Sequence, residues 1–305
     1  MKIVRLLMMA IIIVLMVAFV FSKNNWDEKI EQHSQQSMDN VAQTKSMEVL
    51  GEKEIVQEKE STEEKAEVIE DEEKAASVKS EESEFYNLLL EQKITSIKLL
   101  GDGITAGYGH SAYSAPDGGR IIFHGNGETY REAGYEFDSW ANQLRNYASK
   151  PEFGEVDVIN AGIRDKTADW TLRNLDRLLK PKEEAVIVMI GTDDRIFITL
   201  EEYEATMRKL LAVADERSES MIVMSPPPSK EDLQPYKFTM KEINEVLKNI
   251  SEEKGYTFIS QFDAFQEQME NGVKYESLMQ TATSNPQNDG YELIWQTMKQ
   301  ELDLQ

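Results

Sequence analysis

The stretch "LLGDGITAGYG", Leu99 to Gly109, decides the fold of this chain, because a short apolar run ends there in a tight Gly-Asp-Gly bend. Such a bend at the carboxyl end of a buried strand often displays a reactive side chain. The residue at this bend is Gly103, which has no side chain to react. The spacing of the glycines matches neither a dinucleotide-binding fingerprint nor a Walker loop. The stretch therefore predicts a strand end without an obvious nucleophile.

Further short apolar runs alternate with amphipathic stretches along the rest of the chain. Nearly continuous apolar runs are typical of strands that are buried on both faces. We therefore predict an α/β fold, a doubly wound, five-stranded parallel sheet flanked by helices in three layers, as in flavodoxin. The predicted strands are 96–101, 156–160, 185–190, 221–224 and 256–259, and the predicted helices are 138–149, 167–179, 199–216, 240–253 and 288–302.

In a doubly wound sheet the ligand crevice lies beyond the carboxyl ends of the strands. Gly162 follows the second predicted strand and could offer a backbone N–H to the crevice. Asp193 and Asp194 follow the third. Asn288 or Asp289 is a candidate cap for the last helix.

The amino terminus carries Lys2 and Arg5 ahead of an apolar run from Leu6 to Phe21. The length of this run approaches that needed to cross a bilayer. Bulky side chains stand where a signal-peptide cleavage site would need small ones. We therefore expect residues 1–22 to form an uncleaved signal anchor, with the amino terminus cytoplasmic and the rest of the chain outside the cell membrane. Secretion after cleavage is the alternative.

Residues 23–83 are rich in Glu, Lys, Gln and Ser, and contain too few apolar residues to form a packed core. We predict an acidic, disordered tether there, with a dimerising helix as the alternative, and a domain over residues 84–305. The formal net charge is −23, which argues against a nucleic-acid partner. The absence of cysteine excludes disulfides, thiolate metal sites and cysteine nucleophiles.

Together the predicted strand ends resemble the SGNH, or GDSL, family of serine esterases and lipases over residues 94–302. That family has Gly-Asp-Ser after the first strand, Asn-x-Gly after the second, Gly-x-Asn-Asp after the third, and Asp-x-x-His-Pro before the last helix. The corresponding stretches here are "LLGDGITAGYG", "NAGIRD" (160–165), "IGTDD" (190–194) and "ATSNPQNDGYELI" (282–294).

At most positions to which the resemblance assigns the family's chemical roles, this chain has a residue that cannot perform the role. The nucleophilic serine falls on Gly103 and the oxyanion asparagine on Asp193. The triad aspartate falls on Ala282 and the triad histidine on Asn285. Gly162 alone is retained from that set. The resemblance thus implies an ester hydrolase fold, and these residues imply a member without the family's acyl-transfer chemistry.

The histidines support this conclusion independently of the family. A serine nucleophile needs a base within hydrogen-bond reach, usually histidine. The three histidines are His33 in the predicted tether, His110 and His124. None lies in the later part of the domain, where the base would be needed.

Two interpretations of the acidic residues at the strand ends remain open. Asp102, Asp193 and Asp194 can cap helices and accept buried hydrogen bonds. They can instead form an acidic pocket for a metal or for an amine-bearing sugar or aminoacyl group. The candidate ligand-binding residues are Asp102, Gly103, Gly162, Asp193, Asp194 and Asn285. No motif implies a cofactor or a specific metal site.

Residues 109–140 form a long insertion between the first strand and its helix, of a length that is common for lids or mobile loops. We expect His110 and His124 to be exposed loop residues, or alternatively to form a site with Asp117 or Glu128. Aromatic residues in or near this insertion could stack on sugar rings or pack into the core. They are Tyr108, Tyr113, Tyr130 and Trp140.

The sequence therefore predicts a membrane-tethered, extracytoplasmic SGNH-like protein without acyl-transfer activity. Its expected partners are the membrane, through the amino-terminal segment, and a cell-envelope glycan, an acylated carbohydrate or a protein. One alternative is a rewired hydrolase that acts on esters through acidic residues or a metal. Another is a structural or regulatory interaction protein.

Overall fold

The computed structural model describes residues 83–114, 119–125, 127–135 and 137–304. The chain divides between Val78 and Lys79 into two units, and all described residues lie in the second. The predicted anchor and all but the last residue of the predicted tether lie outside the described residues. Within the described part of the chain, no helix combines the length and apolar character needed to cross a bilayer.

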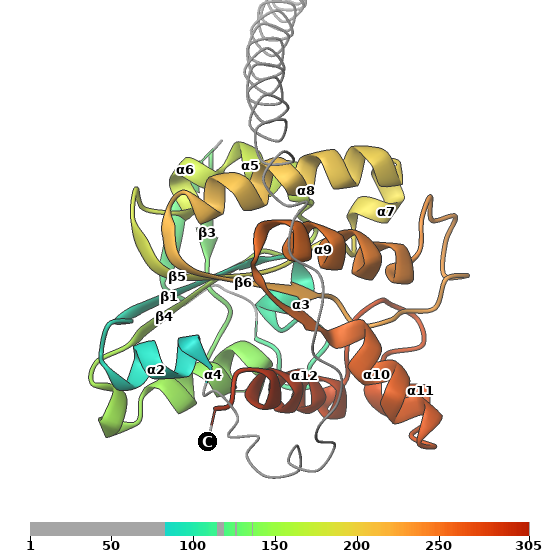
Figure 1. The fold of residues 1–305 in the computed structure, drawn as a ribbon. Coiled ribbons are helices and arrows are strands. Elements are labelled where there is room, and N and C mark those ends of the chain that lie inside the picture. The colour runs from blue at the N-terminus through green and yellow to red at the C-terminus, as the bar shows by residue number, and fades with distance from the viewer. Residues whose placement is uncertain (1–82, 115–118, 126, 136, 305) are drawn as a thin grey trace, which may run out of the picture. The chain divides into compact units, whose positions relative to one another are not determined.

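A five-stranded sheet forms the centre of the domain (Figure 1). All neighbouring strands pair in parallel, in the order β4-β1-β5-β6-β7. The predicted five-stranded parallel sheet is therefore confirmed. The strands are β1 (Ser96–Gly101), β4 (Asp157–Gly162), β5 (Glu183–Met189), β6 (Ser218–Ser225) and β7 (Thr257–Ser260).

The apolar runs form strands because both faces of the sheet are covered. Leu99 and Ile187 pack into one core, and Leu100 and Val188 pack into a second core on the opposite face. Successive side chains of a strand point to opposite faces, so a strand buried on both sides is apolar at nearly every position. The sheet is thus the middle layer of three.

Helices from different parts of the chain cover each face (Figure 1). The first core includes side chains of α2 (Glu84–Leu90), α4 (Trp140–Ala148), α10 (Gln261–Glu270), α11 (Tyr275–Leu278) and α12 (Asn288–Glu301). The second core includes side chains of α5 (Ala168–Arg173), α6 (Leu175–Leu178), α8 (Leu200–Asp215) and α9 (Met240–Lys254). Two short helices follow strand ends, α3 (Gly103–Ala106) after β1 and α7 (Asp194–Phe197) after β5.

α12 begins at Asn288 as predicted, but neither Asn288 nor Asp289 is its N-cap residue. Gln287 is its N-cap residue and makes no side-chain capping bond. Asn288 instead accepts the backbone N–H of Ser111 at 2.9 Å and donates to the Ser111 hydroxyl at 2.8 Å. The side chain of Asn288 therefore ties the insertion to α12 rather than capping the helix.

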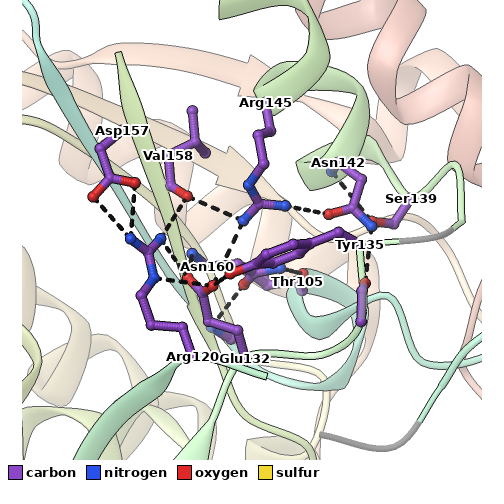
Figure 2. Close-up of polar contacts among 12 residues, drawn as sticks. Thr105, Arg120, Glu132, Tyr135, Ser139, Asn142, Arg145, Asp157, Val158 and Asn160 are labelled. Carbon is purple, nitrogen blue, oxygen red and sulfur yellow. Dashed lines mark hydrogen bonds and ion pairs between the residues drawn. The ribbon is translucent and has the colours of Figure 1, made fainter. Parts of the chain in front are cut away.

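The insertion contains an antiparallel hairpin that the sequence analysis did not predict. Its strands are β2 (Ile121–Gly125) and β3 (Glu128–Arg131). The carboxylate of Glu132, directly after β3, is fully buried. It accepts from Arg120 at 3.1 Å and 3.2 Å and from the backbone N–H of Asn160 at 2.7 Å (Figure 2). The insertion is thus attached to β4 through a buried charge.

Further contacts enclose the Glu132 carboxylate (Figure 2). The Tyr135 hydroxyl donates to it, and an Arg145 nitrogen lies 3.9 Å from it. The Arg145 guanidinium also lies over the Tyr135 ring, 4.0 Å from its centroid. Arg120 bonds both oxygens of Asp157 at 2.8 Å. A buried carboxylate needs such charged and hydrogen-bonded partners, because burial removes its hydration.

Candidate functional site

A cavity of about 340 Å³ opens at the carboxyl end of the sheet. It is lined by the loops that follow β1, β4, β5 and β6, and by the segment that precedes α12. Ligand crevices of doubly wound sheets form at this edge, because the loops after neighbouring strands converge there. Its volume is within the usual range for small-molecule sites.

The structure brings together four positions that the sequence analysis matched to the family's chemical set. Gly103, Asp193, Ala282 and Asn285 all line the cavity, and so does Asp102. These residues come from three separate parts of the chain, so their convergence depends on the tertiary fold. The cavity is open rather than filled by side chains.

Gly103 has room for a side chain. A Cβ atom added there would lie 3.6 Å from the Tyr108 Cβ and 3.7 Å from the Arg164 Cγ, which is ordinary van der Waals contact. Its backbone is outside the left-handed region that favours glycine. The fold therefore does not require a glycine at this bend.

Gly162 does not line the cavity, and its expected role as a donor to the crevice is corrected accordingly. Its backbone N–H donates to the Asn160 side chain at 2.9 Å. An added Cβ would lie 2.6 Å from the backbone nitrogen of Ala106 and 2.7 Å from atoms of Thr105. Gly162 is thus required by the close packing of α3 on β4. The same loop instead presents Asp165 to the cavity, in the left-handed conformation with φ 60°.

Asp102 and Asp194 have structural partners. Asp102 accepts the backbone N–H groups of Ile104 at 3.0 Å and Thr192 at 3.2 Å, and so caps α3. Both oxygens of Asp194 accept the backbone N–H of Ala168 at 3.1 Å. Burial raises the pKa of both carboxyls, that of Asp194 to about 7. Asp194 does not line the cavity, so the interpretation as a buried hydrogen-bonding group applies to it.

Asp193 is the acidic residue at this site whose side chain makes no hydrogen bond or ion pair within the described residues. Burial, followed by the charges of Asp102 and Asp165, raises the pKa of Asp193 to about 7. The charges of Arg195 and Arg164 lower the pKa of Asp193 in part. A carboxyl with a pKa near neutrality exchanges its proton readily, and as a carboxylate it presents an unused acceptor to the cavity.

The sequence analysis missed two arginines at the site. Arg164 lies over the Tyr108 ring, 3.9 Å from its centroid, and pairs with Asp165 at 3.3 Å. Arg195 lies behind the wall of the cavity, 3.7 Å from the centroid of the Tyr236 ring. The only sequence signal for Arg164 and Arg195 is their place after predicted strands, because their partners come from loops distant in sequence.

Arg195 is fully buried, and each of its contacts orders the wall of the cavity. It donates to Glu231 and to the Ser229 hydroxyl at 2.8 Å, and to the Ser284 hydroxyl at 3.3 Å. Ser284 also bonds the Tyr236 hydroxyl at 3.1 Å. The loop after β6 and the segment before α12 are therefore joined through one guanidinium.

The histidines of the insertion do not line the cavity. The His110 ring packs between Phe137 and Tyr291, with centroids at 5.2 Å and 5.9 Å, and burial lowers its pKa. His110 is therefore a loop residue, as expected, but it is half-buried rather than exposed. His124 is exposed, but on β2 rather than in a loop, and bonds the Thr129 hydroxyl at 3.0 Å.

Among the described residues, no group of three or more histidines and carboxylates is placed to hold a metal ion. Asp117, which was considered as a partner of the histidines, lies outside the described residues. Glu128 instead accepts the hydroxyl of Tyr130 at 2.6 Å.

The aromatic residues considered for sugar stacking have separate locations. Tyr108 lines the cavity. Tyr113 packs edge-on against Tyr108 at 5.3 Å between centroids. Tyr130 stacks on Phe123 in the hairpin, 4.6 Å between centroids. Trp140 is fully buried in the core and is not available to a ligand.

Comparison with solved structures identifies proteins of the same fold. The acetylxylan esterase Axe2 from Geobacillus stearothermophilus matches in structure with a TM-score of 0.52 at 22% identity, over 68% of this chain and 94% of that one. LAE5, an alpha/beta hydrolase enzyme from the metagenome of Lake Arreo, matches with a TM-score of 0.52 at 18% identity, over 69% of this chain and 95% of that one. At such identities these structures show a shared fold.

Sequence comparison is more specific. A curated acetylxylan esterase from Geobacillus stearothermophilus is 30% identical over 132 residues, which cover 38% of this chain and 59% of that protein. The match thus spans less than two thirds of the relative's length. The sequence model of the GDSL-like lipase/acylhydrolase family matches residues 99–278, which is more than half of the chain and includes three of the four quoted stretches. The chain belongs to the GDSL-like lipase/acylhydrolase family.

Proposed function

We propose that this chain, although a member of the family, binds a carbohydrate ligand and does not catalyse acyl transfer. We further propose that its domain is held at the outer face of a cell membrane. The observation that carries the proposal is Gly103. This residue lines the cavity. The resemblance assigns the family's nucleophile to its position, and a glycine offers no side-chain atom for an acyl intermediate. The lining of the cavity also contains no histidine among the described residues.

The loss of catalytic rate expected from these replacements is large, which favours ligand binding over residual catalysis. In a studied serine protease, removal of the whole triad lowers turnover by a factor of about 10⁶. Loss of an oxyanion donor costs about 3 to 4 kcal/mol more. The resemblance assigns the family's oxyanion asparagine to the position of Asp193, where an ionised carboxylate would repel a developing oxyanion. Binding requires none of these groups.

The lining of the cavity favours a carbohydrate as the ligand class. Hydroxyl and amide side chains of Gln234, Thr283, Ser284 and Asn285 surround it, with the rings of Tyr108 and Tyr236. Polar groups that bond sugar hydroxyls beside aromatic rings that contact sugar faces are suited to glycans. The similarity to acetylxylan esterases also favours a carbohydrate ligand, by analogy.

The membrane location rests on the sequence of residues 1–22. The positive charges before the apolar run, and the acidic segment after it, favour a domain outside the membrane. A glycan of the cell envelope is then the carbohydrate within reach. A fusion of an extracytoplasmic reporter enzyme to the carboxyl terminus tests the orientation, since an inactive reporter would contradict it.

A rewired hydrolase is a second candidate, favoured by Asp193. A carboxyl with a pKa of about 7 in a cavity is suited to general acid or base catalysis. In this mechanism water would be the nucleophile, and no covalent intermediate would form on the protein. Turnover without covalent labelling, lost in Asp193→Ala, would support this candidate.

The test uses the full-length chain in three assays. Turnover of p-nitrophenyl acetate should not exceed that of a heat-denatured sample, and a fluorophosphonate probe should not label the protein. Calorimetry should show binding of a tetramer of N-acetylglucosamine, weakened in Tyr236→Ala. Covalent labelling at the cavity would overturn the proposal, and so would the absence of glycan binding.

A further inference from the structure

Two of the described residues that line the cavity are tyrosines, and an arginine lies over the ring of each. Arg164 lies 3.9 Å from the centroid of the Tyr108 ring, and Arg195 lies 3.7 Å from that of the Tyr236 ring. Arg164 lines the cavity with half of its side chain exposed, whereas Arg195 is fully buried and does not line it. A ligand therefore meets a guanidinium beside Tyr108, but at Tyr236 it meets the ring and not the guanidinium.

The Tyr236 ring keeps one face free of other rings and cations. Arg195 covers the opposite face, and no second aromatic ring or cation among the described residues packs on Tyr236. Tyr108, by contrast, also contacts Tyr113 edge-on at 5.3 Å between centroids. Because Tyr236 is half-buried and lines the cavity, the face away from Arg195 is the one available to a ligand.

Arg195 holds this ring in a defined orientation. Its guanidinium donates to the Thr192 carbonyl at 3.3 Å, and to Glu231 and the Ser229 hydroxyl at 2.8 Å. These bonds fix the plane of the guanidinium, because the donors of arginine diverge in a rigid fork. The ring that stacks on this plane is fixed with it, and the ring hydroxyl bonds that of Ser284 at 3.1 Å.

A fixed ring at this place favours binding. Tyr236 lies outside any helix or strand, in the segment between β6 and α9. A side chain that a ligand must first immobilise loses conformational entropy on binding, and a ring that is already ordered avoids this cost. A pyranose ring presents C–H groups on its faces, and these gain apolar burial when they pack on a flat aromatic face.

We propose that the free face of Tyr236 is the platform on which one pyranose ring of the glycan stacks, and that Arg195 is the positioning residue that fixes this platform. This inference rests on the function proposed above and names the sugar-contacting surface of the same cavity. Arg195 does not line the cavity, so its effect on the ligand passes through the ring.

The first experiment observes the ring by fluorine NMR of the full-length chain labelled with fluorotyrosine. The signal that is absent in Tyr236→Phe is that of Tyr236. Saturation with a tetramer of N-acetylglucosamine should shift this signal. The signal of Tyr130, assigned in the same way, should not move, because Tyr130 packs on Phe123 in the hairpin and does not line the cavity. An unshifted Tyr236 signal in a chain that binds the tetramer would overturn the inference.

The second experiment measures the affinity of the variants for the same tetramer by calorimetry. Arg195→Lys keeps the charge but lacks the planar fork. We expect it to bind about tenfold more weakly, as for the loss of a desolvated cation–π contact, and to shift the Tyr236 signal in the absence of ligand. Arg208→Lys is the matched control, because Arg208 pairs with Glu204 and Glu253 away from the cavity and should keep the affinity. Unchanged affinity in Arg195→Lys would overturn the positioning role.

Thermal unfolding shows whether Arg195→Lys folds, and Glu231→Gln replaces it if it does not. Glu231 does not line the cavity, and its charge orients Arg195. This variant should bind about threefold more weakly and shift the Tyr236 signal. An unchanged affinity and signal would overturn the inference while leaving the proposed function intact. No binding of the tetramer to the unmodified chain would instead contradict the proposed function.

Discussion

The buried carboxylate of Glu132 accepts the backbone N–H of Asn160 at 2.7 Å (Figure 2). Asn160 in turn donates its side-chain amide to the Thr105 carbonyl of α3 at 2.8 Å and accepts from Gly162. The insertion, the end of β4 and the bend at Gly103 are thus joined by one polar network. This network connects the insertion and β4 to α3, the helix that begins at Gly103.

Glu132→Gln should therefore lower the free energy of unfolding by about 3 kcal/mol, because it leaves the charges of Arg120 and Arg145 partly unpaired near a buried position. Chemical denaturation measures the loss. Asp157→Asn is the matched control, since Asp157 pairs with the same Arg120 but its side chain is 55% exposed. The control should cost less than about 1 kcal/mol. Equal losses in the two variants would contradict the assignment of the buried charge as the main attachment.

Gly103→Ser should fold as stably as the unmodified chain, because the added Cβ meets only ordinary contacts. It should still hydrolyse no ester, since a serine without a base is a weak nucleophile. Gly101→Ser is the control, because a Cβ there would lie 2.0 Å from the Thr105 hydroxyl and 2.3 Å from the Met189 carbonyl. Thermal unfolding should show a large decrease for Gly101→Ser alone. A strong destabilisation by Gly103→Ser would mean that the bend requires glycine.

The combined replacement Gly103→Ser, Asp193→Asn, Ala282→Asp and Asn285→His should produce ester hydrolysis. These four positions line one cavity, and the replacements supply a nucleophile, an oxyanion donor and a base with its orienting acid. We expect measurable turnover of p-nitrophenyl acetate and labelling by a fluorophosphonate. The triple variant that keeps Asn285 should be inactive, because partial triads lose nearly all activity. An inactive but folded quadruple variant would contradict the equivalence of these positions.

Asp193→Asn should also change how stability depends on pH. The folded chain keeps the Asp193 proton up to a pH of about 7, whereas the unfolded chain releases it near the ordinary value of 3.8. Raising the pH through this interval therefore lowers stability, because the folded state must release a proton from an unfavourable site. We expect Asn at this position to stabilise the protein by about 1 to 2 kcal/mol at pH 8, and less at pH 5.

Denaturation curves at the two pH values, compared with those of Asp169→Asn, measure this difference. Asp169 is on α5 and does not line the cavity, so its replacement should shift both curves by similar amounts. A gain from Asp193→Asn that is equal at pH 5 and pH 8 would refute the assigned titration.

The sequence by itself determined the layered α/β architecture of this domain. Apolar runs such as 185–190 become central strands because helices cover both faces, and this requirement is visible in a continuous apolar pattern. The sequence also determined that the bend after β1 carries Gly103, whatever the surrounding structure. The apolar runs and the glycine at this bend are properties of the local sequence, so they can be identified without knowledge of tertiary contacts.

Only the tertiary structure decided which residues meet at the cavity and which do not. Gly162 ends β4, just before the loop that lines the cavity, but its N–H donates to Asn160 and its Cα packs against α3. Arg195 orders the cavity wall through Glu231 and Ser284, which are 36 and 89 residues away along the chain. The reason is physical: a strand end places a side chain near the crevice, but the partners that satisfy its charge and hydrogen bonds come from distant loops.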